Sequence, residues 1–164
     1  DRRVKRADCL REFAKTMVSQ AHTPVGAGLD GDTIKAALFN NSTNPDKDEA
    51  LATAGYNAST SPWVTANEVI DGDSDWPAGG LALAGKTVTT PSSGVVQFSA
   101  TNLTHANTVT LTNAFGCLVY NDSITGGTVA DQGVTYHYFG GGQSVTAGTF
   151  TIVWHANGLF QITV

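Results

Sequence analysis

The chain has 164 residues, of which 41% are hydrophobic and 14% are charged, and its formal net charge is −5. This length suits one domain, or one domain with an attached arm. The hydrophobic fraction and the small net charge exclude a disordered chain, and no run approaches the ~18 apolar residues of a membrane-spanning helix. Abundant Thr, Gly and Val with few charged residues are typical of short strands and tight turns, so we expect an all-β fold.

The first segment, residues 4–21, has the spacing of an amphipathic helix. Its hydrophobic residues recur every three or four positions, and the basic residues lie largely on the opposite face. The hydrophobic stripe comprises Val4, Ala7, Leu10, Phe13, Ala14, Met17, Val18 and Ala21. Pro24, Gly26 and Gly28 then end the pattern. We predict a basic helical arm and linker over residues 1–28 and a β domain over residues 29–164.

Charge is divided unevenly between these two parts. Residues 1–15 hold six of the nine basic residues and carry a net charge of +3, whereas the remainder carries −8. Beyond Lys86 the only charged residues are Asp122 and Asp131. A monomer usually keeps itself soluble with mixed surface charge, so this composition indicates a protein that assembles with copies of itself or with a partner. The negative charge of the β domain argues against nucleic acid as that partner.

Short strands are expected throughout the β domain. The candidates are residues 33–40, 61–70, 81–90 (a strand pair or one bent strand), 95–100, 108–112, 114–121, 133–139, 149–155 and 159–164. Glycine-rich turns separate them at residues 126–127, 140–142 and 156–158, and Asn157-Gly158 predicts a tight hairpin. Strands at this spacing favour an antiparallel β-sandwich, jelly-roll-like in type.

One acidic turn is a weak candidate for a calcium site. Asp71, Asp73 and Asp75 alternate along the chain, and their carboxylates would converge if the backbone curls. The glycine and glutamate of an EF-hand loop are missing at the required positions, because Trp76 and Ala82 occupy them. The alternative is a turn of solvated acids.

The histidines and cysteines are open to two interpretations. His137 and His155 fall on strand candidates, where such a pair can bind a metal or act as a base, or can be half-buried and hydrogen-bonded to the sheet. Cys9 and Cys117 have no CxxC or Cys/His spacing, so buried free thiols are expected rather than a zinc site. No Gly-x-Ser-x-Gly elbow or phosphate-binding loop is present, so no catalytic residue and no cofactor is predicted.

Several segments in a fixed order resemble a family of small virion proteins of tailed bacteriophages. They are TIKAALFNNS (33–42), the EV…WPAGGLALAGKTVT run (68–89), FGCLVYND (115–122) and FGGGQSVTAGTFTIVWHANGLFQIT (139–163). Together they span about four fifths of the chain. The resemblance implies a non-enzymatic structural role in the phage particle, as in head decoration or minor structural proteins.

This resemblance, with the charge division, leads to specific expectations about partners. A decoration (cement) protein would lie on the head surface, as a trimer of this chain that bridges subunits of the major capsid protein. Its arm would bury Leu10, Phe13 and Met17 in a groove of a neighbour, while Arg2, Arg3, Lys5 and Arg6 meet acidic groups. In the alternative, the same stripe closes one end of the chain's own sandwich. No contact with a membrane is expected.

Two other functions remain as hypotheses. The first is a tail or head-fibre component that attaches to the host surface through exposed aromatic residues, namely Trp63, Trp76, Tyr136 and Tyr138. The second is a secreted sugar-binding module, or a hydrolase, with a calcium-braced loop at Asp71–Asp75.

Overall fold

The computed structural model describes residues 28–43, 45, 53–71, 75–105, 108–127 and 129–163. Within them the protein is all-β, with antiparallel strands, which confirms the predicted fold class. The strands are β1 (Ile34–Phe39), β2 (Leu81–Ala82), β3 (Thr87–Ser92), β4 (Val95–Ser99), β5 (Leu103–Thr104), β6 (Val109–Asn121), β7 (Gln132–Gly148), β8 (Thr151–Ile152) and β9 (Phe160–Thr163), with a 3-10 turn, η2, at Thr65–Asn67. No helix in this described part has the length and hydrophobicity needed to cross a membrane.

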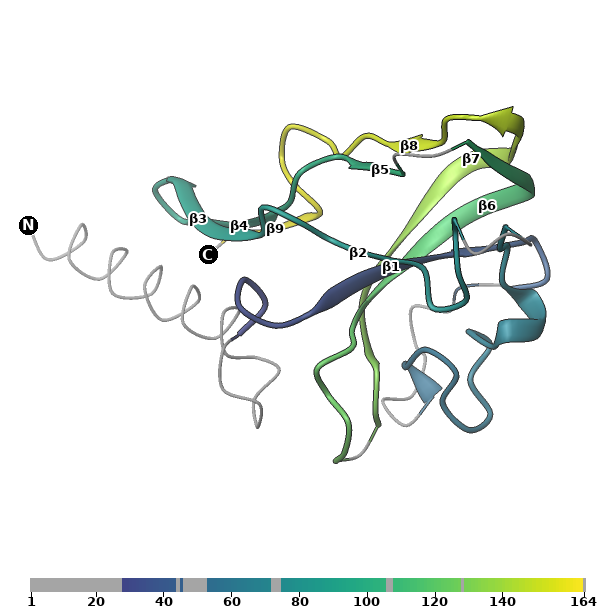
Figure 1. Ribbon diagram of the computed structural model, residues 1–164. Helices are drawn as coiled ribbons and strands as arrows, with labels where there is room; N and C mark the ends of the chain where they lie inside the picture. Colours follow the sequence, from purple (N-terminus) through teal and green to yellow (C-terminus); the bar gives the residue numbers. More distant parts are fainter. Residues whose placement is uncertain are drawn as a thin grey trace, which may run out of the picture.

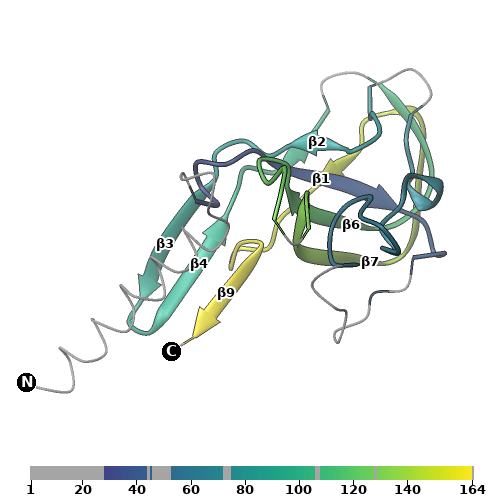
Figure 2. The same ribbon diagram turned by 90° about the horizontal axis from the view of Figure 1, so that it is seen from below.

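The strands form three antiparallel sheets. The largest has the order β2-β1-β6-β7, the second has the order β3-β4-β9, and β5 pairs with β8. Figures 1 and 2 both show β3, β4 and β9 together at one end of the molecule, away from the paired β6 and β7. Asn157-Gly158 makes a tight turn, in which the Gly158 N–H donates to the His155 carbonyl at 2.8 Å. The predicted hairpin is confirmed only as this turn, which is closed by an isolated antiparallel bridge between His155 and Gly158; the strands on either side do not pair, because β8 pairs with β5 and β9 pairs with β4.

Strand β1 is buried on both of its faces. Ile34, Ala36 and Leu38 face the main hydrophobic cluster, whereas Ala37 and Phe39 face a second cluster that includes Trp63. A strand covered on both sides needs apolar residues at successive positions rather than in alternation. The run IKAALF therefore forms the centre of the sheet, between β2 and β6.

The second cluster is covered by the segment before β2. Trp63 packs edge-on against Phe39 at 5.3 Å between ring centroids, and Tyr56 stacks on Tyr120 of β6 at 4.7 Å. The predicted strand over residues 61–70 is wrong, because this stretch holds η2 and pairs with β1 through one isolated bridge, Phe39–Glu68, beside which the Val69 N–H donates to the Leu38 carbonyl at 2.8 Å. The large apolar residues there serve as a cover over the sheet and not as a strand within it.

Strands β6 and β7 form a long hairpin that differs from the prediction in two places. Residues 108–112 and 114–121 were expected as two strands, yet β6 continues through Asn113, which takes a positive φ of 56° at a shift in register. The glycines 140–142 were expected to be a turn. They lie instead inside β7, where residues 139–142 face the single residue Phe115 of β6. This is a bulge of four residues against one, and Gly140 and Gly141 supply its positive φ angles of 81° and 155°.

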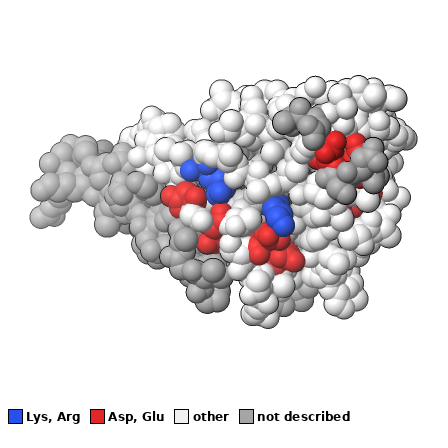
Figure 3. All heavy atoms as spheres, in the orientation of Figure 1, with Lys and Arg blue, Asp and Glu red and all other residues white. Residues whose placement is uncertain are grey.

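Charged side chains are few on the described surface. Lys35 and Lys86 are the only Lys or Arg residues that the structure describes, and Lys35 pairs with Asp122 at 2.9 Å. Figure 3 shows the charged groups as small islands on a face that is otherwise uncharged. The arm residues Arg2, Arg3, Lys5, Arg6, Leu10, Phe13 and Met17 lie outside the described residues, as does Cys9.

Candidate binding site

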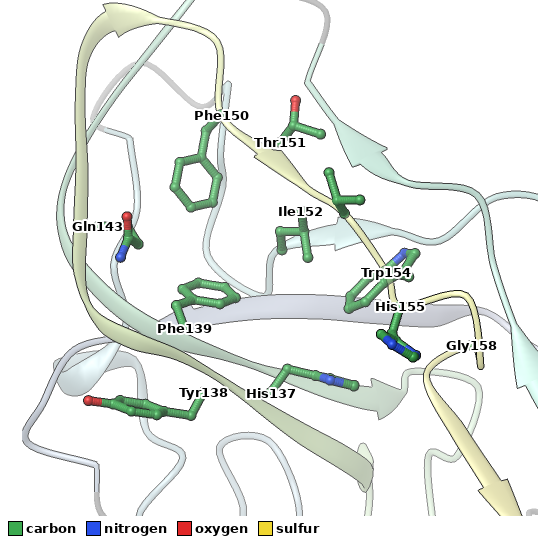
Figure 4. Close-up of a pocket in the computed structure, with 11 residues that line it drawn as sticks. His137, Tyr138, Phe139, Gln143, Phe150, Thr151, Ile152, Trp154, His155 and Gly158 are labelled. Atoms are coloured by element: carbon green, nitrogen blue, oxygen red, sulfur yellow. The ribbon is translucent and has the colours of Figure 1, made fainter.

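A pocket of about 390 Å³ lies between β7 and the returning segment 150–158 (Figure 4). The chain bends at the bulge of residues 139–142 and reverses after β7 ends at Gly148. This reversal brings β8 close to β7. The pocket is therefore built from two stretches that are close in sequence and joined by a single reversal. It is larger than a water site and falls within the range of small-molecule pockets.

Aromatic rings form the floor of this pocket. The ring centroids of Phe139 and Phe150 are 6.2 Å apart, and Phe150 packs edge-on against the fully buried Trp76 at 5.6 Å. Trp154 is fixed at both ends, since its indole Nε1–H donates to the Thr101 carbonyl at 3.0 Å and its backbone N–H donates to Asn102 Oδ1 at 3.0 Å. The floor is thus rigid, because its rings belong to or rest on the main hydrophobic core.

His137 and His155 line this same pocket, but only His137 lies on a strand, β7, whereas His155 follows β8 and makes an isolated bridge to Gly158. His137 is half-buried, and its ring lies 5.2 Å from that of Trp154. Burial lowers the pKa of His137 below its usual value, so its imidazole is neutral at physiological pH. Its buried Nε2 has no hydrogen-bond partner among the described residues. His155 is exposed, and its Nδ1 accepts the Asn157 N–H at 3.1 Å.

These positions bear on the two interpretations of the histidines, as a metal-binding or basic pair and as half-buried residues bonded to the sheet. The described residues contain no group of three His, Cys, Asp or Glu side chains that could hold a metal ion. The interpretation of half-buried, hydrogen-bonded rings holds in part for His137, which is half-buried but has no partner for Nε2 among the described residues; it is wrong for His155, which is exposed. Cys117 is a fully buried free thiol, as expected, and burial raises its pKa to about 12.

A second hollow, of about 370 Å³, lies beside the first and is lined by Phe115, Tyr136 and Tyr138 with Asn41, Thr43 and Pro45. Tyr138 borders both hollows and is 62% exposed. Burial raises the pKa of Tyr136 to about 12. The predicted aromatic contact face is wrong for Trp63 and Trp76, which are 4% and 0% exposed and belong to the core.

The predicted calcium turn is only partly described. Asp71 is buried rather than solvated, and its Oδ2 accepts the Thr110 N–H at 2.7 Å, which ties the end of the turn to β6. Asp75 also makes interactions, and Asp73 lies outside the described residues.

The sequence patterns missed two polar clusters, one half-buried and one buried. In the first, the carboxylate of Glu68 bonds to the Tyr56 hydroxyl at 2.9 Å and to the Gly79 N–H at 2.7 Å. In the second, the fully buried Asn121 donates to Asp32 Oδ2 at 2.8 Å. Both clusters join a loop to the four-stranded sheet, so their role is to hold the fold together.

No protein-family model, curated protein or solved structure matches this chain. The ligand that the pocket can bind is therefore inferred from the residues that line it. An aromatic floor with an uncharged polar rim can bind a neutral ligand that has both an apolar face and hydroxyl or amide groups.

Proposed function

We propose that this chain is a structural protein of a tailed-bacteriophage particle, a decoration (cement) protein that stabilises the head by bridging capsid subunits. The finer fold in this proposal is a jelly-roll-like β-sandwich over residues 29–164, with residues 1–28 as a helical arm. The partners are the major capsid protein and further copies of the chain in a trimer on the head surface. The role is non-enzymatic and uses no cofactor.

The observation that carries the proposal is the scarcity of charge on the β domain. No Lys or Arg follows Lys86, while Val153 and Tyr138 are 71% and 62% exposed. A monomer that stays free in solution usually carries mixed charges that discourage contact. A surface without them is suited to lie against other protein, and the resemblance of residues 33–164 to phage virion proteins supports another protein of the phage particle as that neighbour.

The arm is assigned to attachment on the grounds of its sequence. Residues 1–15 carry +3 and the remainder carries −8, so the arm can be drawn to an acidic neighbour. In this assignment Arg2, Arg3, Lys5 and Arg6 meet acidic groups, and Leu10, Phe13 and Met17 enter an apolar groove. Adding such contacts between subunits stabilises the shell, because a ligand that binds only the assembled state shifts the equilibrium toward it.

Copy number and position in the purified particle test the proposal. Quantitative mass spectrometry should find the chain at many copies per particle, and electron microscopy should place its density over the head. Replacing Arg2, Arg3, Lys5 and Arg6 by Ser should reduce binding to undecorated heads, whereas Lys35→Ser, which removes a cation from the β domain, should not. A handful of copies confined to the tail would contradict the proposal.

One observation favours a second candidate, a tail or head-fibre component that attaches to the host surface. Tyr138 is an exposed aromatic residue between two hollows, which is a common arrangement for a contact residue. The same microscopy separates the two candidates by location. If Tyr138→Ala left adsorption to host cells unchanged, this second candidate would lose its support.

A further inference from the structure

The pocket between β7 and β8 has an apolar floor and a polar rim. Figure 4 shows Phe139, Phe150 and Trp154 around the hollow, with Gln143 near the bulge and His155 at the other end. Gln143, Thr151 and His155 are exposed, whereas Trp154 is 9% exposed. A ligand would therefore rest on aromatic surface and meet hydrogen-bonding groups at its edge.

The absence of charge in this pocket narrows the class of ligand. No Asp, Glu, Lys or Arg is among the residues that line it. A phosphate or carboxylate would find no cationic partner there, because no Lys or Arg follows Lys86 in the sequence. A metal ion would find two imidazoles but no third ligand among the described residues.

The rim offers both a donor and an acceptor. Because His155 Nδ1 accepts the Asn157 N–H, the neutral ring carries its proton on Nε2, which is a donor. The Gln143 amide donates to the Gly141 carbonyl at 3.3 Å through Nε2, and this leaves Oε1 as an acceptor. His137 places a third hydrogen-bonding atom beside the Trp154 ring, its buried Nε2, which has no partner among the described residues.

From this combination we propose that the pocket binds a neutral sugar ring. A pyranose has one face of C–H groups that can stack on the aromatic floor, and its hydroxyl groups both donate and accept hydrogen bonds at the rim. A volume of about 390 Å³ accommodates a small saccharide. The inference goes beyond the proposed structural role and holds wherever the protein lies in the particle.

The test uses the full chain labelled with nitrogen-15 and titrated with glucose, galactose, mannose, N-acetylglucosamine and their disaccharides. At least one neutral sugar should produce saturating shifts in residues 137–143 and 150–158. The indole N–H signal of Trp154 should move, whereas those of the core residues Trp63 and Trp76 should not. Absence of a saturating shift with every sugar in the series, or shifts centred elsewhere, would overturn the proposal.

Matched variants separate the pocket from the rest of the surface. Gln143→Ala and His155→Ala alter exposed side chains, so they should fold normally, and each should weaken sugar binding about 3- to 10-fold through one lost hydrogen bond. Gln161→Ala, on exposed β9 outside the pocket, should leave binding unchanged. Equal affinity for all three variants would contradict the proposal. So would pocket signals that respond only to added capsid shells, because a protein neighbour would then occupy the site.

Discussion

The Tyr56 hydroxyl donates a 2.9 Å hydrogen bond to Oε2 of Glu68, and this pair fastens the loop that covers one face of the central sheet. The other carboxylate oxygen accepts the Gly79 N–H, and the Gly79 carbonyl accepts the Tyr120 hydroxyl of β6 at 2.8 Å. A loop, a turn and a strand are thus joined through one half-buried carboxylate.

Glu68 should make stability depend on pH. Burial raises its pKa above the usual 4.5, so the folded state binds its proton more tightly than the unfolded state does. Stability should therefore fall as pH rises through the interval between the unfolded and folded pKa values. Glu68→Gln keeps an acceptor for Gly79 and cannot ionise, so relative to wild type its stability should improve as pH rises.

Urea denaturation between pH 4 and pH 8 measures this effect. Glu68→Ala should lose about 1–3 kcal/mol at low pH, because two part-buried donors, the Tyr56 hydroxyl and the Gly79 N–H, are left without their partner. Burial also raises the pKa of Asp131, so this residue too should make stability fall as pH rises. Combining Asp131→Asn with Glu68→Gln should remove both contributions. If the free energy of unfolding changed with pH in the same way for wild type and Glu68→Gln, the Glu68 carboxyl would have the same pKa in the folded and unfolded states, which would contradict the prediction.

Asn121 should be among the most sensitive polar positions. Its side chain donates to Asp32 and accepts the Ser123 N–H at 3.0 Å, and its own exposure is 0%. Asn121→Ala should cost about 2–4 kcal/mol in chemical denaturation, since the buried Asp32 carboxylate and the part-buried Ser123 N–H both lose their partner. Lys35→Ala removes a part-exposed ion pair with Asp122 and should cost less than about 1 kcal/mol. Similar losses for the two variants would contradict the assignment.

Gly80 should not tolerate a side chain. Its φ is +71°, and a Cβ atom there would collide with the backbone carbonyl of Ala36 in β1. Gly80→Ala should destabilise the protein by about 3 kcal/mol or more, because both strain and a backbone clash are introduced. Gly126→Ala is the matched control, since nothing lies within 4 Å of its added Cβ. Thermal unfolding of both variants would reveal a large gap, and equal melting temperatures would refute the expectation.

Cys117 should be inert in the folded protein. It is 0% exposed, and burial raises its pKa to about 12, so almost no thiolate forms at neutral pH. Iodoacetamide at pH 8 should leave the Cys117 peptide unmodified in native protein and alkylate it in urea, as read by peptide mass spectrometry. Rapid native alkylation at Cys117 would mean that β6 opens readily to solvent.

Sequence patterns could predict the elements of the fold that are determined by residues close together in the chain. The strand predicted over residues 33–40 is confirmed as β1, at Ile34–Phe39, because a compact apolar run is itself a strand signal. The stretch 61–70 was mistaken for a strand because Trp63 and Val69 are just as apolar. Which apolar segment pairs within a sheet and which lies over it depends on contacts between distant residues, and a single sequence does not encode these as a local period.

Single residues of the pocket could be predicted from the sequence, but the pocket itself could not. His137 and His155 were identified as strand residues, but their common pocket depends on the bulge at 139–142 and on the reversal after Gly148. The glycines 140–142 did signal positive φ angles, yet a turn and a bulge use the same residues. The Glu68 cluster gave no signal, because its members come from loops without any repeat.

The position of β1 between β2 and β6 has a consequence for how the chain folds. Ile34 pairs with Asn121, so β1 can complete its pairing only after β6, which lies far along the chain, has been synthesised. During synthesis β1 can meet β2 first, but its other edge stays open until β6 has left the ribosome. Such long-range pairing slows folding and leaves an apolar edge open to wrong partners in the meantime. The speed of translation between these two strands should therefore influence the yield of native protein.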